Sequence, residues 1–285
     1  MISPAEKAYI LEQAYIPEHL VDLMTQVSGG EPFLWGDYFG LRGRDWTIMV
    51  GYPLSGEFLL ERFGAAVREI LDKFRPREVW VIAPRLPGDW EGRFSELERD
   101  HYFTLDMPAG IPRPLQRAVS KARENLTVTR TTACTEPHLT LIREFLERVN
   151  PHPRMRELYL SMPRYVGKSP SALILDAHDH EGNLTAFYVV DLAVPRFAAY
   201  IIGCRSWRHP APYASDLLMA EMIALSQEQG KTYIHLGLGV SPGIRRFKEK
   251  WGGRPTRPYE MGRLIWRKPS IFTSLWNRGH AGSRV

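Results

Sequence analysis

The sequence predicts an α+β fold built as two successive domains, each with a mixed, mostly antiparallel sheet flanked by helices. The chain has 285 residues, which is enough for two domains with separate cores. Short strand-like runs alternate with amphipathic helical segments along its whole length. A segment rich in proline and glycine, Pro108 to Pro114, divides these elements into two sets. We therefore expect domains at 1–112 and 113–268 and a C-terminal tail at 269–285.

The first half reads as helix, strand, strand, helix, strand, strand. Apolar residues at helical spacing predict helices up to about residue 28 and again at 58–74. The predicted strands are 33–41, 46–52, 79–83 and 102–105. Because Val79 to Ala83 is an unbroken apolar run, we expect that strand to be buried on both faces.

The second half contains more elements, in a different order. A short basic helix at 115–124 precedes the order β-α-α-β-β-β-α-β-α-β. The predicted strands are 126–132, 172–177, 184–191, 197–203, 232–236 and 259–266, and the predicted helices are 137–149, 153–162, 214–229 and 242–251. We expect the first half to repeat the strand-strand-helix-strand-strand core of the second.

The composition is that of a globular protein, with 44% hydrophobic and 24% charged residues. Two isolated cysteines, Cys134 and Cys204, are too few for a disulfide framework or a thiolate metal site. The N-terminus lacks a basic segment followed by an apolar core, and the apolar runs are shorter than the ~20 residues of a spanning helix. These features predict a cytoplasmic protein.

The charge is a modest excess of base, +5 with a pI near 9.2, which suits an anionic ligand but also many proteins that bind none. Hydrolase, ATPase and dehydrogenase fingerprints are missing from the sequence. His178-Asp179-His180 falls in a turn between strands rather than at metal-ligand spacing on a helix. We therefore predict no metal site.

The segment from Gly230 to Gly252 combines a strand, a glycine-rich turn and a helix. Ser241 is placed to cap the helix and Pro242 to occupy its first position. The apolar residues of the helix, Ile244, Phe247 and Trp251, recur at i, i+3 and i+7, and we expect them to form its buried stripe.

Two basic residues of this helix, Arg245 and Lys248, are three positions apart and are predicted to share a partly exposed face. Gly237 and Gly239 in the preceding turn allow close approach of another chain segment or a ligand. The turn and the two cations therefore predict an anion-binding site. Charged residues on helices are usually only solvated, so the residues alone favour a solvated basic face on a well-packed helix.

The same segment resembles the FemAB and BioF2-like families of the GNAT superfamily. In those families a Gly-x-x-x-Phe-Lys-x-x-Trp/Phe-Gly helix follows a glycine-rich turn, as at Gly243 to Gly252 here. The match extends to Pro212 to Leu218 and to the basic segment Arg117 to Asn125, and it covers about residues 115–260. It implies a tandem GNAT fold with transfer of an acyl group from acyl-CoA or aminoacyl-tRNA to an amine, and a small-molecule or cell-wall-precursor-like acceptor.

One departure from the wider GNAT pattern concerns the donor. Enzymes that use acyl-CoA carry a glycine-containing loop whose backbone amides hold the pyrophosphate, whereas residues 206–216 contain no glycine. Arg205, Arg208 and His209 would attract a phosphate there, and Asp216 would repel one. With Ser215 at the helix start, these residues are the predicted donor site, together with Gly237, Gly239, Arg245, Phe247 and Lys248.

Two residues are candidates for catalysis, and each has a structural alternative. His235 lies within the strand before the glycine-rich turn and could act as a base or contact the substrate, or serve as a hydrogen-bonded core histidine. Tyr213 could protonate a leaving group or only pack at the helix entry.

We therefore predict an N-acyltransferase or aminoacyltransferase with no tightly bound cofactor, acting on an acyl-CoA or aminoacyl-tRNA donor. The alternative is a catalytically silent GNAT-like module that binds a nucleotide or RNA through the basic segments. We expect the tail at 269–285 to dock on its own domain, and an anionic membrane is the alternative partner.

Overall fold

The computed structural model describes residues 2–266 of the chain, so the predicted tail at 269–285 lies outside the described residues. The α+β class is confirmed, but the chain divides differently from the predicted boundary at 112/113. Within the described residues, one compact unit combines residues 2–30 with Asp100–Pro258, and a second combines Glu31–Arg99 with residues 259–266. The first 30 residues thus belong to the same unit as most of the second half.

The second unit is built on the strands β1 (Glu31–Trp35), β2 (Tyr38–Arg42), β3 (Trp46–Val50) and β4 (Glu78–Ala83), together with the end of β11 (Arg254–Ile265). Their hydrogen-bonded order is β1-β2-β3-β4-β11. Helix α3 (Leu60–Phe74) connects β3 to β4, which are parallel, and the other pairs are antiparallel. The short helix η2 (Gly88–Arg93) follows β4.

The first unit contains a larger sheet in the order β5-β10-β9-β8-β7-β6, in which β9 and β10 are the parallel pair. Its strands are the end of β5 (Phe94–Asp106) from Asp100 onward, β6 (Thr127–Thr131), β7 (Ala172–His178), β8 (Leu184–Asp191), β9 (Phe197–Arg205) and β10 (Tyr233–Leu238). Its helices are α1 (Pro4–Gln13), η1 (Pro17–His19), α2 (Val21–Ser28), α4 (Arg113–Asn125), α5 (Glu136–Val149), α6 (Pro153–Lys168), α7 (Ala214–Glu228) and α8 (Pro242–Lys250).

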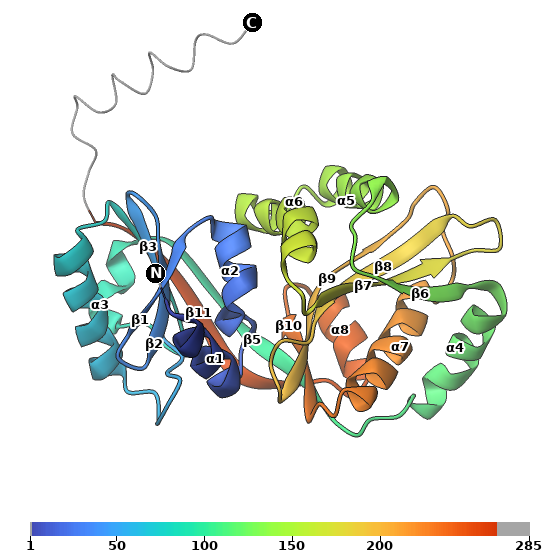
Figure 1. The fold of residues 1–285 in the computed structure, drawn as a ribbon, viewed down its shortest axis with the longest axis horizontal. Helices are drawn as coiled ribbons and strands as arrows, with labels where there is room; N and C mark the ends of the chain where they lie inside the picture. Colours follow the sequence, from blue (N-terminus) through green and yellow to red (C-terminus); the bar gives the residue numbers. More distant parts are fainter. Residues whose placement is uncertain (1, 267–285) are drawn as a thin grey trace, which may run out of the picture. The chain divides into compact units, whose positions relative to one another are not determined.

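Helices cover both faces of this sheet (Figure 1). Helices α4 and α7 pack on one face, where Leu218, Ile234 and Trp251 belong to one apolar cluster. Helices α2, α5 and α6 pack on the other face, where Ile142 and Phe197 belong to a second cluster. Alternate side chains of the central strands therefore enter two different cores, as the pleat requires.

The two units share a pairing pattern. In each, a strand, a helix and a parallel strand follow one another: β3-α3-β4 in the second unit and β9-α7-β10 in the first. The second strand of each parallel pair has an antiparallel neighbour on its other edge: β11 beside β4, and β5 beside β10. Each unit thus takes this last strand from the other half of the sequence. This exchange explains why the units do not follow the predicted linker.

Several predicted boundaries differ from the observed ones. The predicted strand 33–41 is a hairpin of β1 and β2, because Gly36 adopts a left-handed conformation with φ 57° and turns the chain. Helix α6 continues past residue 162 with Pro163 inside it. Strands β5 and β11 begin well before residues 102 and 259, where we expected them to start. Strand β4 has one fully buried face and one half-buried face, not two buried faces.

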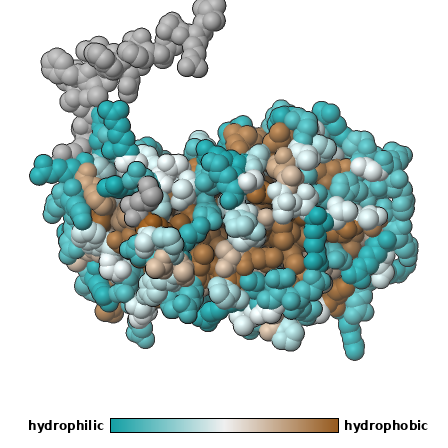
Figure 2. Space-filling view, viewed as in Figure 1, coloured by the Kyte–Doolittle hydropathy of each residue, from teal (hydrophilic) through white to brown (hydrophobic). Residues whose placement is uncertain are grey.

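Among residues 2–266, no helix is both long enough and apolar enough to cross a bilayer. On the face shown in Figure 2, hydrophilic residues (teal) are interspersed with apolar ones (brown).

The packing of β10 gives a first testable prediction. Ile234 is fully buried between α7 and the sheet, so Ile234→Ala should lower the free energy of unfolding by about 2–4 kcal/mol through lost contacts and a cavity. Leu160→Ala is the matched control, because Leu160 is 56% exposed and should change stability by less than about 0.5 kcal/mol. Chemical denaturation measures both, and equal losses would contradict the assignment of β10 to the core.

Candidate functional site

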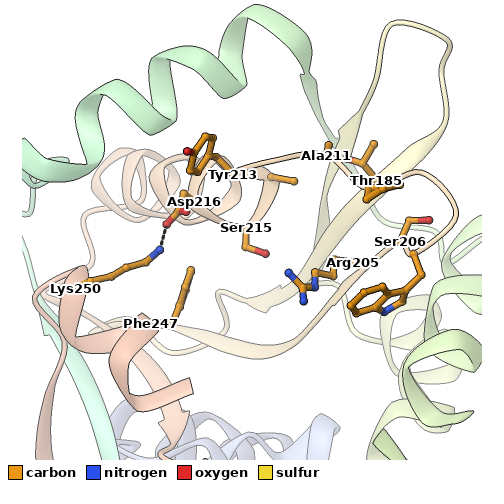
Figure 3. A pocket seen from close by; sticks show the side chains of 12 residues that line it. Thr185, Arg205, Ser206, Ala211, Tyr213, Ser215, Asp216, Phe247 and Lys250 are labelled. Atoms are coloured by element: carbon orange, nitrogen blue, oxygen red, sulfur yellow. Dashed lines mark ion pairs between the residues drawn. The ribbon is translucent and has the colours of Figure 1, made fainter. Parts of the chain in front are cut away.

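A pocket of about 290 Å³ opens in the first unit beside the start of α7. Figure 3 shows its lining side chains, which come from β8, the end of β9, the loop that follows, α7 and α8. The volume lies near the lower end of the range for small-molecule sites. The lining residues are Thr185, Arg205, Ser206, Trp207, Pro210, Ala211, Tyr213, Ala214, Ser215, Asp216, Phe247 and Lys250.

The pocket lies where the parallel strands β9 and β10 end. They pair only at Tyr233 to His235 with Phe197 to Ala199, whereas β10 pairs with β5 along its whole length, from Tyr233 to Leu238. A bulge sits between Val189 and Val190 in the pairing of β8 with β9. Ligands bind preferentially beyond the carboxyl ends of parallel strands, where neighbouring connections diverge. Because the pairing ends early, the start of α7 and the side of α8 are left facing this space.

Asp216, at the start of α7, is not the unpaired negative charge that the sequence suggested. Its carboxylate is 6% exposed, accepts a hydrogen bond from the Trp251 indole at 2.9 Å and pairs with Lys250 at 2.6 Å (Figure 3). The predicted repulsion of phosphate is therefore offset by a cation within the pocket. Asp216 also ties the end of α8 to the start of α7.

Five of the twelve predicted site residues line the pocket: Arg205, Tyr213, Ser215, Asp216 and Phe247. The backbone of Tyr213 is left-handed, with φ 64°, and its side chain is 46% exposed. No side chain caps α7 at this residue, and the first residues of the helix, Ala214 and Ser215, line the pocket.

The other predicted phosphate ligands, Arg208 and His209, do not line the pocket. The Arg208 guanidinium pairs with Glu144 at 3.1 Å. The His209 backbone N–H donates to the Ser206 hydroxyl at 3.0 Å, and the Ser206 N–H donates to the Thr185 carbonyl at 2.7 Å. These contacts hold the loop after β9 in place.

Helix α8 is rotated relative to the predicted orientation. Ser241 caps it as expected, accepting from the Ile244 N–H at 3.3 Å, but the Ile244 side chain is 40% exposed instead of buried. Lys248, predicted to be partly exposed beside Arg245, is only 5% exposed. Short helices present few residues to the core, and here a lysine occupies an inward position that apolar spacing would not assign to it.

Lys248 reaches beneath the end of β10, where its ammonium donates to the Leu238 carbonyl and lies 5.6 Å from the centre of the Phe103 ring. Burial lowers the pKa of Lys248 to about 7, and the Asp100 carboxylate opposes that shift. Lys248 is therefore close to half-protonated at neutral pH.

Asp100 organises the turn between β10 and α8. Its carboxylate accepts from the Val240 N–H at 2.7 Å and from Arg245 at 2.9 Å. A Cβ on Gly239 would lie 2.5 Å from the Arg245 side chain and 2.7 Å from Asp100, so only glycine fits there. Val240 has φ 55°, which is strained for a β-branched residue. The predicted close approach at Gly239 is thus to another chain segment.

His235 is fully buried and lies outside the pocket. Its Nδ1 accepts from the Gly237 N–H at 3.1 Å, where a bulge in β10 and a φ of 73° at Gly237 turn the backbone. Burial, followed by the charge of Lys248, lowers the pKa of His235 well below its usual value, so the ring is neutral. Its Nε2 is buried without a hydrogen-bond partner among the described residues.

His235 and Lys248 belong to a wider group that we call the buried polar cluster: Glu18, Tyr102, His235 and Lys248. The Tyr102 ring contacts His235 edge-on at 5.1 Å between centroids. Burial raises the pKa of Glu18 to about 7, and a hydrogen bond from Tyr102 opposes the shift. Two groups that titrate near neutral pH therefore lie in one cluster, which is a frequent property of functional sites.

Sequence reasoning did not identify Glu18, Asp100, Thr185, Trp207 or Lys250. Glu18 and Asp100 are far from the motif in the sequence, and only the strand exchange and the packing of residues 1–30 bring them to it. Lys250 was within reach of prediction, because it lies in the recognised helix next to Trp251.

No protein-family model matches this chain, and no curated protein sequence matches it. Solved structures match it in fold. The C-terminal domain (DUF2156) of a putative lysylphosphatidylglycerol synthetase from Agrobacterium fabrum is 15% identical with a TM-score of 0.59, over 97% of this chain and 96% of that chain. FemX is 10% identical with a TM-score of 0.59, over 91% and 96%. A tandem GNAT protein from the clavulanic acid biosynthesis pathway is 11% identical with a TM-score of 0.54, over 94% and 97%.

These similarities extend over nearly the whole of each chain, so they include both units. They show that the chain has the α+β fold of tandem GNAT-like proteins, as the element order predicted. At these identities the similarity is one of fold, and the chemistry has to be argued from the site.

The contacts of Asp216 give a second prediction. Asp216→Ala leaves the buried Trp251 indole N–H without an acceptor and should cost about 1–3 kcal/mol of unfolding free energy. Asp216→Asn keeps a carbonyl acceptor and loses only the pair with Lys250, so it should cost less than about 1 kcal/mol. Thermal and chemical denaturation measure both losses. If Asp216→Ala and Asp216→Asn lose the same unfolding free energy, the hydrogen bond to the indole contributes nothing.

The burial of Lys248 gives a third prediction. Its pKa is lowered on folding, so between pH 7 and about 10 the unfolded chain binds one more proton here than the folded protein. The unfolding free energy of the wild type, minus that of Lys248→Met, should therefore rise with pH by up to about 1.4 kcal/mol per unit. Denaturation at pH 6, 7.5 and 9 measures this difference. The difference between the two unfolding free energies should not change with pH below pH 7. If it is the same at all three pH values, Lys248 is solvated.

Proposed function

We propose that this protein is an N-acyltransferase or aminoacyltransferase that moves an acyl group from an activated donor to an amine. The observation that carries the proposal is the pocket at the start of α7, lined by Phe247 and Lys250 of α8, with the buried Lys248, whose pKa is lowered to about 7, between them in the sequence. A general base is most effective when its pKa lies near the working pH.

The reaction needs an amine without its extra proton and a carbonyl held against it. The amine nitrogen attacks the acyl carbon, a C–N bond forms, and the C–S bond of a thioester or the C–O bond of an aminoacyl ester breaks. We assign the proton released by the amine to neutral Lys248 and the proton taken up by the leaving group to Tyr213. The backbone amides at the start of α7 are suited to bind the negative charge of the donor.

The proposed donors are acyl-CoA and aminoacyl-tRNA, both made in the cytoplasm, where we place the reaction. The Phe247-Lys248 motif and the glycine-free loop at 206–213 favour the FemAB-like branch of the fold and hence an aminoacyl donor. The similarity in fold to FemX and to a putative lysylphosphatidylglycerol synthetase supports the same choice. A cell-wall-precursor-like or small amine is the proposed acceptor.

The test is a transfer assay with radiolabelled acetyl-CoA and with labelled aminoacyl-tRNAs, each offered a panel of amines. We expect kcat/KM of the wild type to rise with pH through an apparent pKa near 7 as Lys248 loses its proton. Lys248→Met should lower kcat/KM by about 10²- to 10⁴-fold and abolish that rise. Lys121→Met on the exposed side of α4 removes the same charge and should have little effect.

Full activity of Lys248→Met would exclude Lys248 as the base. If neither donor class supports transfer while a nucleotide or RNA binds, the protein is a catalytically silent binding module instead.

A further inference from the structure

An exposed tryptophan stands at the rim of the pocket. Trp207 lies two residues after the end of β9, lines the pocket and is 43% exposed. A large aromatic side chain that is left open to solvent at a pocket rim offers a flat apolar surface to a ligand.

Two guanidinium groups lie over the Trp207 ring. The Arg148 guanidinium carbon is 3.0 Å and that of Arg205 is 4.9 Å from the ring centre. Both arginines are exposed, and neither pairs with a carboxylate among residues 2–266. The three side chains form what we call the Trp207 cluster: Arg148, Arg205 and Trp207.

Glu144 holds the backbone of the Trp207 cluster in place. Glu144 lies one turn before Arg148 on α5, and its carboxylate accepts from the Trp207 backbone N–H at 3.1 Å. The same carboxylate pairs with Arg208 at 3.1 Å. Glu144 therefore fixes the backbone of the loop and neutralises Arg208, while the charges of Arg148 and Arg205 stay unbalanced.

Cation–π contacts by themselves do not explain why two guanidinium groups lie over one indole ring. An exposed contact of this kind contributes only about 0.5–1 kcal/mol, and two cations that share one ring repel each other. An anion bound beside the ring would relieve that repulsion, and a flat ring would extend the stack of indole and guanidinium planes. A ligand with both properties is a nucleotide.

We propose that the Trp207 cluster binds the nucleotide end of the acyl donor, with the base stacked on the indole and guanidinium planes and a phosphate beside Arg148 and Arg205. Bases stack on aromatic and arginine side chains in single-stranded nucleic-acid sites with little regard to sequence. This inference rests on the proposed function, because the rest of the donor then extends from Trp207 into the pocket toward α7.

The first experiment compares adenosine 5′-monophosphate with ribose 5-phosphate, which lacks the base, in NMR titrations at low salt. We expect the monophosphate to bind about 5- to 100-fold more tightly in the wild type, from the measured range for one stacked base. Trp207→Ala should remove that difference, and Trp207→Phe should keep most of it. Arg148→Gln and Arg205→Gln should weaken both ligands.

Two variants serve as matched controls. Trp35→Ala removes a partly exposed tryptophan that has Lys73 4.4 Å from its ring but lies in the other unit, outside the pocket. Lys168→Gln removes an exposed cation at the end of α6. Both should bind the two ligands as the wild type does. If the wild type does not distinguish the two ligands, or if Trp207→Ala keeps the difference, the proposal is overturned.

The second experiment identifies the source of the nucleotide. Coenzyme A and an RNA minihelix ending in CCA are titrated into the wild type and Trp207→Ala at 50 and 200 mM salt. If Trp207→Ala weakens the binding of coenzyme A but not that of the minihelix, the site belongs to acyl-CoA. Weaker binding of the minihelix alone, with a steep loss at the higher salt, assigns it to the 3′ end of tRNA. If Trp207→Ala binds both as the wild type does, no donor uses the site.

The two proposals fail separately. Acyl transfer with an unchanged donor KM in Trp207→Ala overturns the nucleotide site and leaves the proposed function standing. Nucleotide binding that depends on Trp207, in a protein that transfers no acyl group, supports the site and overturns the proposed function.

Discussion

The pairing of strand β10 is the constraint on which the rest of the site depends. It is held by β9 over three residues and by β5 along the other edge, so β9 and β10 separate early. The start of α7 and one side of α8 line the pocket beside the end of β9.

The same pairing determines which groups become buried. Because β5 comes from the first half of the sequence, it carries Asp100 and Tyr102 to the end of β10, beside Lys248. A buried lysine costs several kcal/mol unless it is neutral or paired. Here it has a carbonyl acceptor and a nearby carboxylate, and burial still lowers its pKa to about 7 against the opposing effect of Asp100.

Charge around the pocket is divided between paired and unpaired groups. Asp216 is neutralised by Lys250, and Arg208 by Glu144, whereas Arg148 and Arg205 remain available at the rim. The charge at the rim therefore favours an anionic ligand. It comes from tertiary contacts and not from the modest total charge of +5.

Local physics explains what the sequence determined by itself: the α+β class, the order of elements, the cap at Ser241 and the close approach at Gly239. The five predicted residues of the pocket came from the family resemblance of the motif. Propensity, periodicity and turn chemistry act within a few residues, so a single chain reveals them. The tertiary structure decided the exchange of β5 and β11, the burial of Lys248, and the meeting of Glu18 and Asp100 with α8. These depend on contacts between residues more than 100 positions apart, and no local pattern in the sequence specifies such pairs.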